Sequence, residues 1–258
     1  MSSDDSLVNE AVGLVEEAEH RGLILRVLGA LAIRLHCPEN QPLLDAMKRV
    51  ITDIDFAAYG QQKADIVRFI VEHGYSQRQH LTIGTFVGRE IFESEDGKHI
   101  DVFLDKLEYC HTVHFKNRLE KDRPTIPLSE LLLEKTQIVQ INEKDLKDLT
   151  VILLEHEIGE GDREAINAKE ISKILFNDWG FYYTVTTNLK RIIEACSSYD
   201  VLNEDQRKLV AGRATKVLEH IENEPKTLGW KVRAKIGPAK KWYRDVEEVD
   251  RADWLSQS

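Results

Sequence analysis

The sequence predicts an α/β (α+β) protein, with a mixed sheet flanked by helices and followed by a helical C-terminal region. Short apolar or alternating segments typical of strands lie between segments with helical spacing in roughly the first hundred residues. After about Pro127 only helical spacing recurs, and we expect no further strand. The 258 residues, 42% of them hydrophobic, suffice for two modest globular domains. We expect residues 1–158 and 163–258 to form these domains, with Gly159–Asp162 as the linker.

Helices and strands alternate in the first half of the chain. Apolar residues at three- and four-residue steps predict a helix over Ser6–Arg21, and Ser6 can cap its start. The apolar run Leu23–Leu28 ends at Gly29 and is typical of a buried strand. The patterns that follow predict helix 30–36, loop 37–42, strand 49–56, helix 62–73 and a hairpin of strands 89–92 and 99–104 around an Asp-Gly turn.

The second half of the chain shows Leu, Ile and Val at helical spacing throughout. We expect these residues to form the buried faces of packed amphipathic helices. The predicted helices span residues 128–141, 144–156, 168–176, 183–195 and 204–223.

Several classes of protein and site are disfavoured by composition. The apolar run Leu23–Leu35 is broken by Arg26 and Arg34, so it fits neither a signal segment nor a membrane span, and we expect a cytoplasmic protein with no membrane partner. His111 and His114 would face opposite sides of a strand, which disfavours a metal clip. The cysteines are far apart, and we expect free thiols at Cys37, Cys110 and Cys196.

The formal net charge of −10 argues against a general duplex-DNA binder, because such proteins neutralise phosphates with Lys and Arg. Residues 226–244 are the exception, since seven Lys or Arg residues surround Trp230, Trp242 and Tyr243 there. Two interpretations stay open for this segment. It is either a solvated C-terminal segment whose aromatic side chains dock on the body of the protein, or a nucleic-acid contact.

Three carboxylates form a candidate catalytic and metal site. Asp53 and Asp55 are two residues apart on a predicted strand, so their side chains would point to the same face. Asp101 interrupts a second apolar strand and can supply a third ligand, and we prefer it to Asp105, which lies at the end of that strand. Mg²⁺ favours such carboxylate oxygens. The competing interpretation makes Asp53 and Asp55 the solvated face of an edge strand.

A candidate phosphate site lies where Leu28-Gly29 ends a strand and Ala30 begins a helix. The free backbone N–H groups and the positive end of the helix dipole attract phosphate at such a junction. Gly29 would allow a triphosphate to approach the backbone closely. For an isolated glycine, a plain tight turn is the competing interpretation.

Taken together and in order, these segments resemble the nucleotidyltransferase superfamily, in particular its compact prokaryotic branch with the abortive-infection toxins. The resemblance covers about Leu25–Leu154. It departs from the family pattern at Ala30, where a Gly or Ser is usual. The residues that carry it are Leu28-Gly29-Ala30, Thr52-Asp53-Ile54-Asp55, Ile100-Asp101-Val102, Leu131-Leu132-Leu133-Glu134-Lys135 and Lys144-Asp145-Leu146-Lys147-Asp148-Leu149.

The resemblance implies a nucleotidyltransferase-like fold and the transfer of a nucleotidyl group from a nucleoside triphosphate to an unknown acceptor, which could be a small molecule, RNA or protein. Mg²⁺ or Mn²⁺ would be held by Asp53, Asp55 and Asp101, and Asp101 would also act as the base. The alternative is a nucleotide-binding regulatory or defence module with little or no catalysis, partnered by an antitoxin.

The resemblance also implies nucleotide-binding roles for residues on two of the predicted helices. Lys135 would contact triphosphate oxygens, Lys144 and Asp145 would lie near the nucleotide, and Asp148 would orient Lys135 or a neighbouring backbone group. Generic helix patterns alone would instead leave Lys135 facing solvent and make Lys144 and Asp145 first-turn charges.

Overall fold

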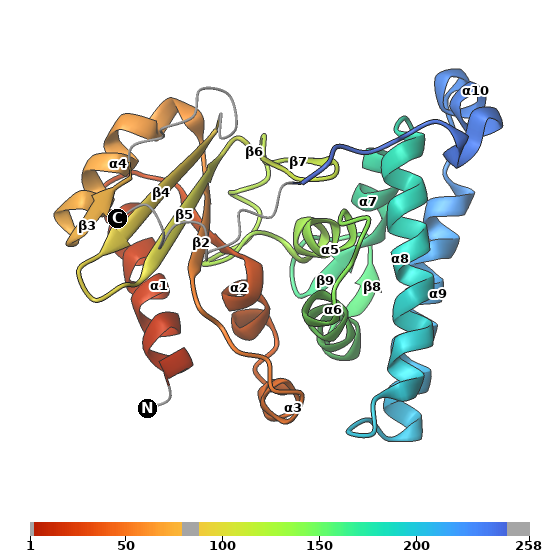
Figure 1. The fold of residues 1–258 in the computed structure, drawn as a ribbon, viewed down its shortest axis with the longest axis horizontal. Helices are drawn as coiled ribbons and strands as arrows, with labels where there is room; N and C mark the ends of the chain where they lie inside the picture. Colours follow the sequence, from red (N-terminus) through yellow and green to blue (C-terminus); the bar gives the residue numbers. More distant parts are fainter. Residues whose placement is uncertain (1–2, 79–87, 247–258) are drawn as a thin grey trace.

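The computed structural model describes residues 3–78 and 88–246, which form an α/β part and a helical part side by side (Figure 1). The α/β part contains α1 (Ser3–His20), β1 (Leu25–Leu28), α2 (Gly29–His36), α3 (Gln41–Ala46), β2 (Ile54–Ala58), a 3-10 turn (Gly60–Gln62), α4 (Lys63–Glu72), β3 (Tyr75–Gln77), β4 (Arg89–Ser94), β5 (His99–Leu104), β6 (Lys106–Glu108) and β7 (Thr112–His114).

The helices follow with two short strands between them. These elements are α5 (Leu128–Thr136), α6 (Glu143–Glu155), β8 (Glu157–Gly159), β9 (Ala165–Asn167), α7 (Ala168–Leu175), α8 (Trp179–Ser198), α9 (Glu204–Asn223), α10 (Leu228–Ile236) and a final 3-10 turn (Gly237–Ala239). In residues 3–78 and 88–246, every helix is too short or too polar to cross a lipid bilayer.

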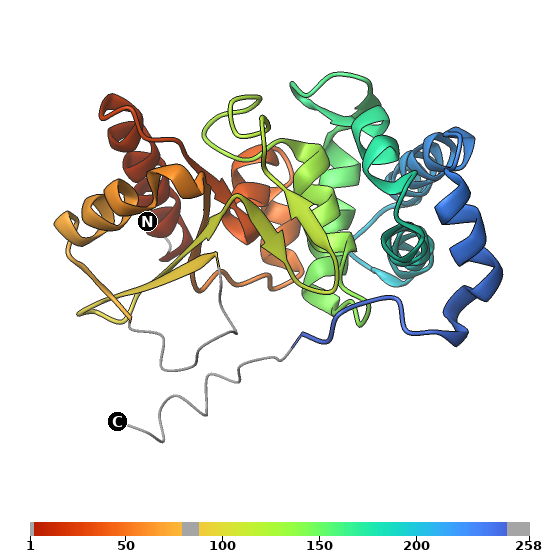
Figure 2. The ribbon, with the colours of Figure 1, turned by 90° about the horizontal axis from the view of Figure 1, so that it is seen from above.

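The five-stranded sheet has the order β1-β2-β5-β4-β3, and its strands are antiparallel except for the parallel pair β2 and β5. The predicted mixed sheet is therefore confirmed, as is the hairpin of β4 and β5. Helices α1 and α4 lie along one face of the sheet (Figure 2). In the parallel register Asp55 is the direct neighbour of Asp101. This pairing places two predicted catalytic residues side by side.

The core follows from the sequence patterns. All four residues of β1 are buried, and the inward side chains of the neighbouring strands, such as Phe56, Phe92 and Ile100, are fully buried as well. Helices α5 and α6 stand between the sheet and the long pair α8 and α9 (Figure 1). Burial on both sides explains why nearly every residue of α5 is inaccessible to solvent.

The chain returns to the α/β part after α10 (Figure 1). The backbone N–H of Arg244 donates to the carbonyl of Cys110 at 3.0 Å, and the indole N–H of Trp242 donates to Thr184 at 3.0 Å. The rings of Trp179 and Tyr183 surround Trp242 edge-on. Docking of the C-terminal aromatic residues on the body of the protein, one of the two interpretations of this segment, is confirmed.

Several predicted elements differ from the structure. The predicted strand 49–56 is wrong over residues 49–53, because β2 begins only at Ile54. Arg49 instead forms an ion pair with Asp148 of α6. The expectation of no strand after Pro127 is also wrong, since β8 and β9 pair in parallel. Three-residue strands carry no readable alternation, and β3, β6 and β7 were missed for the same reason. The predicted helix 128–141 ends at Thr136.

The predicted linker Gly159–Asp162 begins with the last residue of β8 and runs on toward β9, and the Asp162 carboxylate pairs with Arg118 at 2.6 Å. It is thus tied to the α/β part by an ion pair. The division into domains 1–158 and 163–258 stays a prediction. The three cysteines are free and buried, as expected.

Candidate active site

The turn between β1 and α2 is built around Gly29. Its φ of +73° lies in the left-handed region that favours glycine. A Cβ at this position would lie 2.6 Å from Oδ2 of Asp55, which is closer than real Cβ contacts allow. Gly29 is therefore required both by its backbone conformation and by the close approach of the Asp55 carboxylate.

The carboxylates of Asp55 and Asp101 come from neighbouring positions of the parallel strands β2 and β5. Asp101 is only 8% exposed, and its Oδ2 accepts a hydrogen bond from Arg89 at 2.5 Å. Its other oxygen, Oδ1, is buried and has no hydrogen-bond partner within residues 3–78 and 88–246. Asp101 thus presents a desolvated acceptor oxygen next to a second acid.

Burial and the neighbouring acids raise the pKa of Asp55 well above its usual range. Burial is the largest cause, followed by repulsion from Asp53 and from Asp101. Asp53 lies just before β2, where Thr52 donates to its Oδ1 at 3.0 Å. Its predicted place on the strand itself is wrong, although its charge still acts on Asp55.

The described part of the chain holds no group of three or more His, Cys, Asp or Glu side chains close enough to bind a metal ion as they stand. The metal site of Asp53, Asp55 and Asp101 therefore stays a prediction. Asp105, the competitor of Asp101, has a different role. It adopts a φ of +64°, and its carboxylate accepts the backbone N–H of Gly60 at 2.9 Å.

Lys135 lies inside a cluster of acids. Its Nζ is 3.4 Å from Glu134, 3.5 Å from Asp145 and 3.5 Å from Asp148, and the residue is 9% exposed. Burial disfavours the ammonium, but the neighbouring carboxylates outweigh it and raise the pKa of Lys135. The interpretation of Lys135 as a solvent-facing residue is wrong. The lysine is charged and fixed by residues of both α5 and α6.

Asp148 connects this cluster to the segment before β2. It is 1% exposed, and Arg49 donates to both of its oxygens, at 2.8 and 2.9 Å. The paired geometry suits a guanidinium and a carboxylate. Arg49 was not singled out in the sequence, because alternation alone made it an ordinary strand residue. Lys144, in contrast, is exposed on the first turn of α6.

Glu134 is the second residue that sequence patterns did not single out as functional. Its Oε2 accepts the backbone N–H of Gly29 at 3.1 Å, at the start of α2 where the sequence predicts phosphate. Burial raises the pKa of this carboxyl group. A phosphate at Gly29 and Ala30 would have to share this position with Glu134.

Several of these acids and Lys135 line one cavity. Its volume of about 680 Å³ is within the usual range for ligand pockets. Asp53, Asp55, Lys135 and Asp145 line it, whereas Gly29, Ala30, Asp101, Lys144 and Asp148 do not. The structure therefore brings four of the nine predicted site residues to one cavity, with Asp101 directly beside them. Its further walls include Tyr109, Glu134, Asn142 and three residues of the C-terminal segment: Tyr243, Asp245 and Val246.

Comparison with protein-family models and with curated proteins gave no match. The solved structures similar to this chain include three that are each 12% identical to it. The antibiotic-resistance factor ANT(2'')-Ia has a TM-score of 0.36 over 85% of this chain and 96% of its own. An antigenic nucleotidyltransferase-like protein from Paracoccidioides brasiliensis has 0.42 over 88% and 96%.

The third is an apo form of a CCA-adding enzyme, with a TM-score of 0.33 over 89% of this chain and 52% of its own. One of the three is described as nucleotidyltransferase-like. Similarity at this level says nothing about which reaction this chain performs.

Proposed function

We propose that the chain transfers a nucleotidyl group from a nucleoside triphosphate to the hydroxyl of an acceptor, in a reaction that depends on Mg²⁺ or Mn²⁺. The observation that carries this proposal is the pairing of Asp55 and Asp101 on parallel strands, directly against the Gly29 turn. Two acids and a tight strand-to-helix turn are the parts that such chemistry requires.

The acids fit a divalent cation. The buried Oδ1 of Asp101 has no hydrogen-bond partner in the described residues, and burial together with repulsion from Asp53 and Asp101 raises the pKa of Asp55. A hard cation would supply the missing partner and relieve the repulsion. When bound, it would activate the attacking oxygen and stabilise the leaving pyrophosphate. Asp101 would receive the proton of the acceptor hydroxyl.

The remaining site residues would hold the nucleotide. Lys135 faces the cavity with its charge intact, which suits contact with triphosphate oxygens. Asp148 would act through Lys135, since its carboxylate lies 3.5 Å from Nζ. Asp145 would face the nucleotide from α6, with Lys144 beside it. The N–H of Ala30 would meet phosphate at the start of α2, and the N–H of Gly29 would be shared between phosphate and Glu134.

A thermal-shift measurement with ATP, GTP, CTP and UTP, each with and without Mg²⁺, tests the proposal. A ligand that binds only the folded state stabilises it, by about 2.7 kcal/mol at a concentration one hundred times its Kd. We expect at least one nucleotide to raise the Tm only when Mg²⁺ is present. The absence of a shift for all four at millimolar concentration would contradict the proposal, and binding without pyrophosphate release would favour the regulatory alternative.

A further inference from the structure

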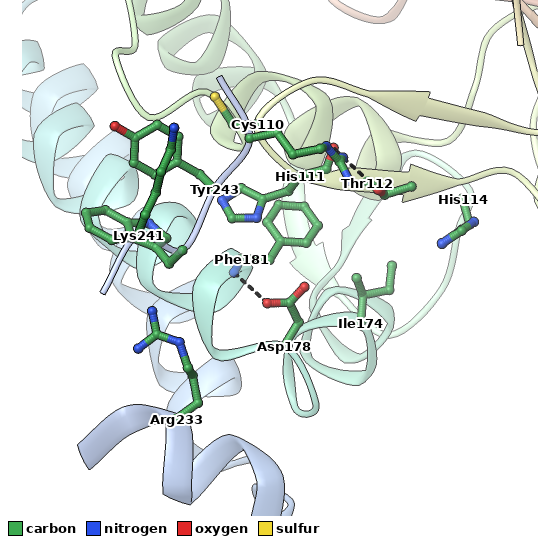
Figure 3. A pocket seen from close by; sticks show the side chains of 12 residues that line it. Cys110, His111, Thr112, His114, Ile174, Asp178, Phe181, Arg233, Lys241 and Tyr243 are labelled. Atoms are coloured by element: carbon green, nitrogen blue, oxygen red, sulfur yellow. Dashed lines mark hydrogen bonds between the residues drawn. The ribbon is translucent and has the colours of Figure 1, made fainter. Parts of the chain in front are cut away.

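The protein has a second cavity, of about 610 Å³, whose lining side chains are drawn in Figure 3. It lies between the β6–β7 hairpin, the start of α8 and the returning C-terminal segment. Cys110 and Tyr243 line both cavities, so the two cavities are adjacent. A molecule in the second cavity would be a neighbour of a nucleotide in the first.

The second cavity is lined by cations from the most basic part of the chain. Residues 225–244 contain seven Lys or Arg residues and no Asp or Glu, in a protein with a net charge of −10. Three of these cations reach the cavity: Arg233, Lys241 and Arg244. Asp178 also lines it, and its carboxylate accepts the backbone N–H of Phe181 as the cap of α8. This N–H carries no net charge, so Asp178 keeps its negative charge, and the described lining has three cations against one acid.

Within residues 3–78 and 88–246, the groups that hold Arg233 are uncharged. Its guanidinium donates to the carbonyls of Gly237 at 2.7 Å and Lys240 at 2.6 Å, and lies 4.4 Å from the ring centre of Trp179. Carbonyl oxygens and aromatic rings carry no net charge, so the guanidinium keeps its own. Lys241 and Arg244, in contrast, have carboxylate neighbours in Asp245 and Glu108. Arg233 is therefore the main source of positive potential in the second cavity.

Flat, uncharged rings form the opposite wall. His111 and Phe181 stack with ring centres 4.9 Å apart, as Figure 3 shows. Burial lowers the pKa of His111 to about 4, so this ring is neutral near pH 7. Trp242 is held by Thr184 at the rim. The cavity thus combines an arginine with an apolar aromatic surface.

We propose that this second cavity binds the acceptor, and that the acceptor is a small anionic molecule with a phosphate or carboxylate group beside an apolar or planar moiety. The proposal rests on the proposed function, because transfer needs an acceptor hydroxyl next to the nucleotide. The cavity volume and the net charge of −10 favour a small molecule over a long polyanion.

The chemistry of the step balances. The acceptor hydroxyl oxygen forms a bond to the α-phosphorus, and the bond from that phosphorus to the oxygen bridging to the β-phosphate breaks. Pyrophosphate leaves with the electron pair, and the hydroxyl proton passes to the carboxylate of Asp101, whose direct neighbour Asp55 lines the first cavity.

Binding of inorganic phosphate, and of acetate in a parallel arm, tests the site through the fluorescence of Trp179 and Trp242, with ionic strength held constant by chloride. We expect a saturable change in the wild type and about tenfold weaker binding in Arg233→Gln, as expected for the loss of a charge-assisted contact. Lys235→Gln removes the same charge from an exposed position of α10 and should bind as the wild type does.

Lys241→Gln provides a second variant in case Arg233→Gln does not fold. Equal affinity in the Arg233→Gln and Lys235→Gln variants would overturn the proposal, as would tight binding of a single-stranded RNA without any response to phosphate or acetate. The Mg²⁺-dependent thermal shift with nucleotide separates the two proposals. Its absence in the wild type, with phosphate binding still dependent on Arg233, would leave an anion site but remove its role as acceptor site.

Discussion

At the scale of single residues, Gly29 and Asp55 constrain each other. The left-handed backbone at Gly29 is available to other residues at a modest cost, but the Asp55 oxygen excludes any Cβ there. The sequence predicted both residues and the turn. It could not predict that Glu134 would accept the Gly29 N–H, because the two are 105 positions apart and no local pattern connects them.

The Gly29→Ala variant tests this constraint, with Gly22→Ala as its matched control. Gly22 has a φ of +74° against +73° for Gly29, but a Cβ at Gly22 would meet nothing within 4 Å. Both variants carry the cost of a left-handed alanine, about 1–2 kcal/mol. We expect Gly29→Ala to lose about 1–3 kcal/mol more, because the new methyl overlaps the carboxylate. If urea unfolding shows equal losses in the free energy of unfolding for the two variants, the close contact between position 29 and Asp55 is contradicted.

At the scale of elements, a buried network of charges joins α5, α6 and the segment before β2. The sequence predicted both helices, and the family resemblance implied nucleotide-binding roles for Lys135 and Asp148. The sequence did not predict that Arg49 would lie before the strand and pair with Asp148. A charged residue in a segment that alternates polar and apolar side chains is expected to face solvent. Short strands such as β8 were missed because three residues give too little pattern.

The Lys135→Met variant tests the network, with the exposed Lys144→Met as control. Removing Lys135 leaves the buried carboxylates of Glu134 and Asp148 and the half-buried one of Asp145 without this cation, and breaking a buried ion pair typically costs about 3–5 kcal/mol. We expect a loss of that order in the free energy of unfolding, against less than about 0.5 kcal/mol for Lys144→Met. Similar stabilities would place Lys135 in solvent after all.

At the scale of the whole molecule, side chains from distant segments hold the α/β part and the helices together. His36, at the end of α2, lies within hydrogen-bond distance of Thr125 and of the carbonyl of Ile126, and its own carbonyl lies 3.0 Å from Nε2 of His156. Burial lowers the pKa of His36 to about 4. Protonation of this residue therefore opposes folding.

The sign of the pH dependence follows from this shift. The unfolded His36 takes up a proton near pH 6.5 and the folded one only near 4, so stability is complete above pH 6.5 and falls as the pH drops toward 4. Between pH 7.5 and 5 the loss from this residue is about 2 kcal/mol. Between pH 7.5 and 5, the free energy of unfolding of the His36→Gln variant should fall by about 2 kcal/mol less than that of the wild type. Between pH 7.5 and 8.5, the free energies of unfolding of the two proteins should depend on pH in the same way. If the free energy of unfolding of His36→Gln falls below pH 6.5 as steeply as that of the wild type, His36 is not buried in its neutral form.

The measurement that bears most directly on the proposed function is binding of Mn²⁺, followed by electron paramagnetic resonance in the presence of a non-hydrolysable nucleoside triphosphate. Asp55→Asn and Asp101→Asn remove the paired acids, and Asp105→Asn changes an acid that contacts the Gly60 backbone instead. Without metal, Asp55→Asn should be at least as stable as the wild type, because a crowded buried charge is lost.

We predict that Asp55→Asn and Asp101→Asn each weaken Mn²⁺ binding about tenfold or more, as expected when a charged ligand contact is lost. Asp105→Asn should bind Mn²⁺ as the wild type does. If all three variants bind Mn²⁺ with wild-type affinity, Asp55 and Asp101 do not hold the metal, and the proposed nucleotidyl transfer at this site is contradicted.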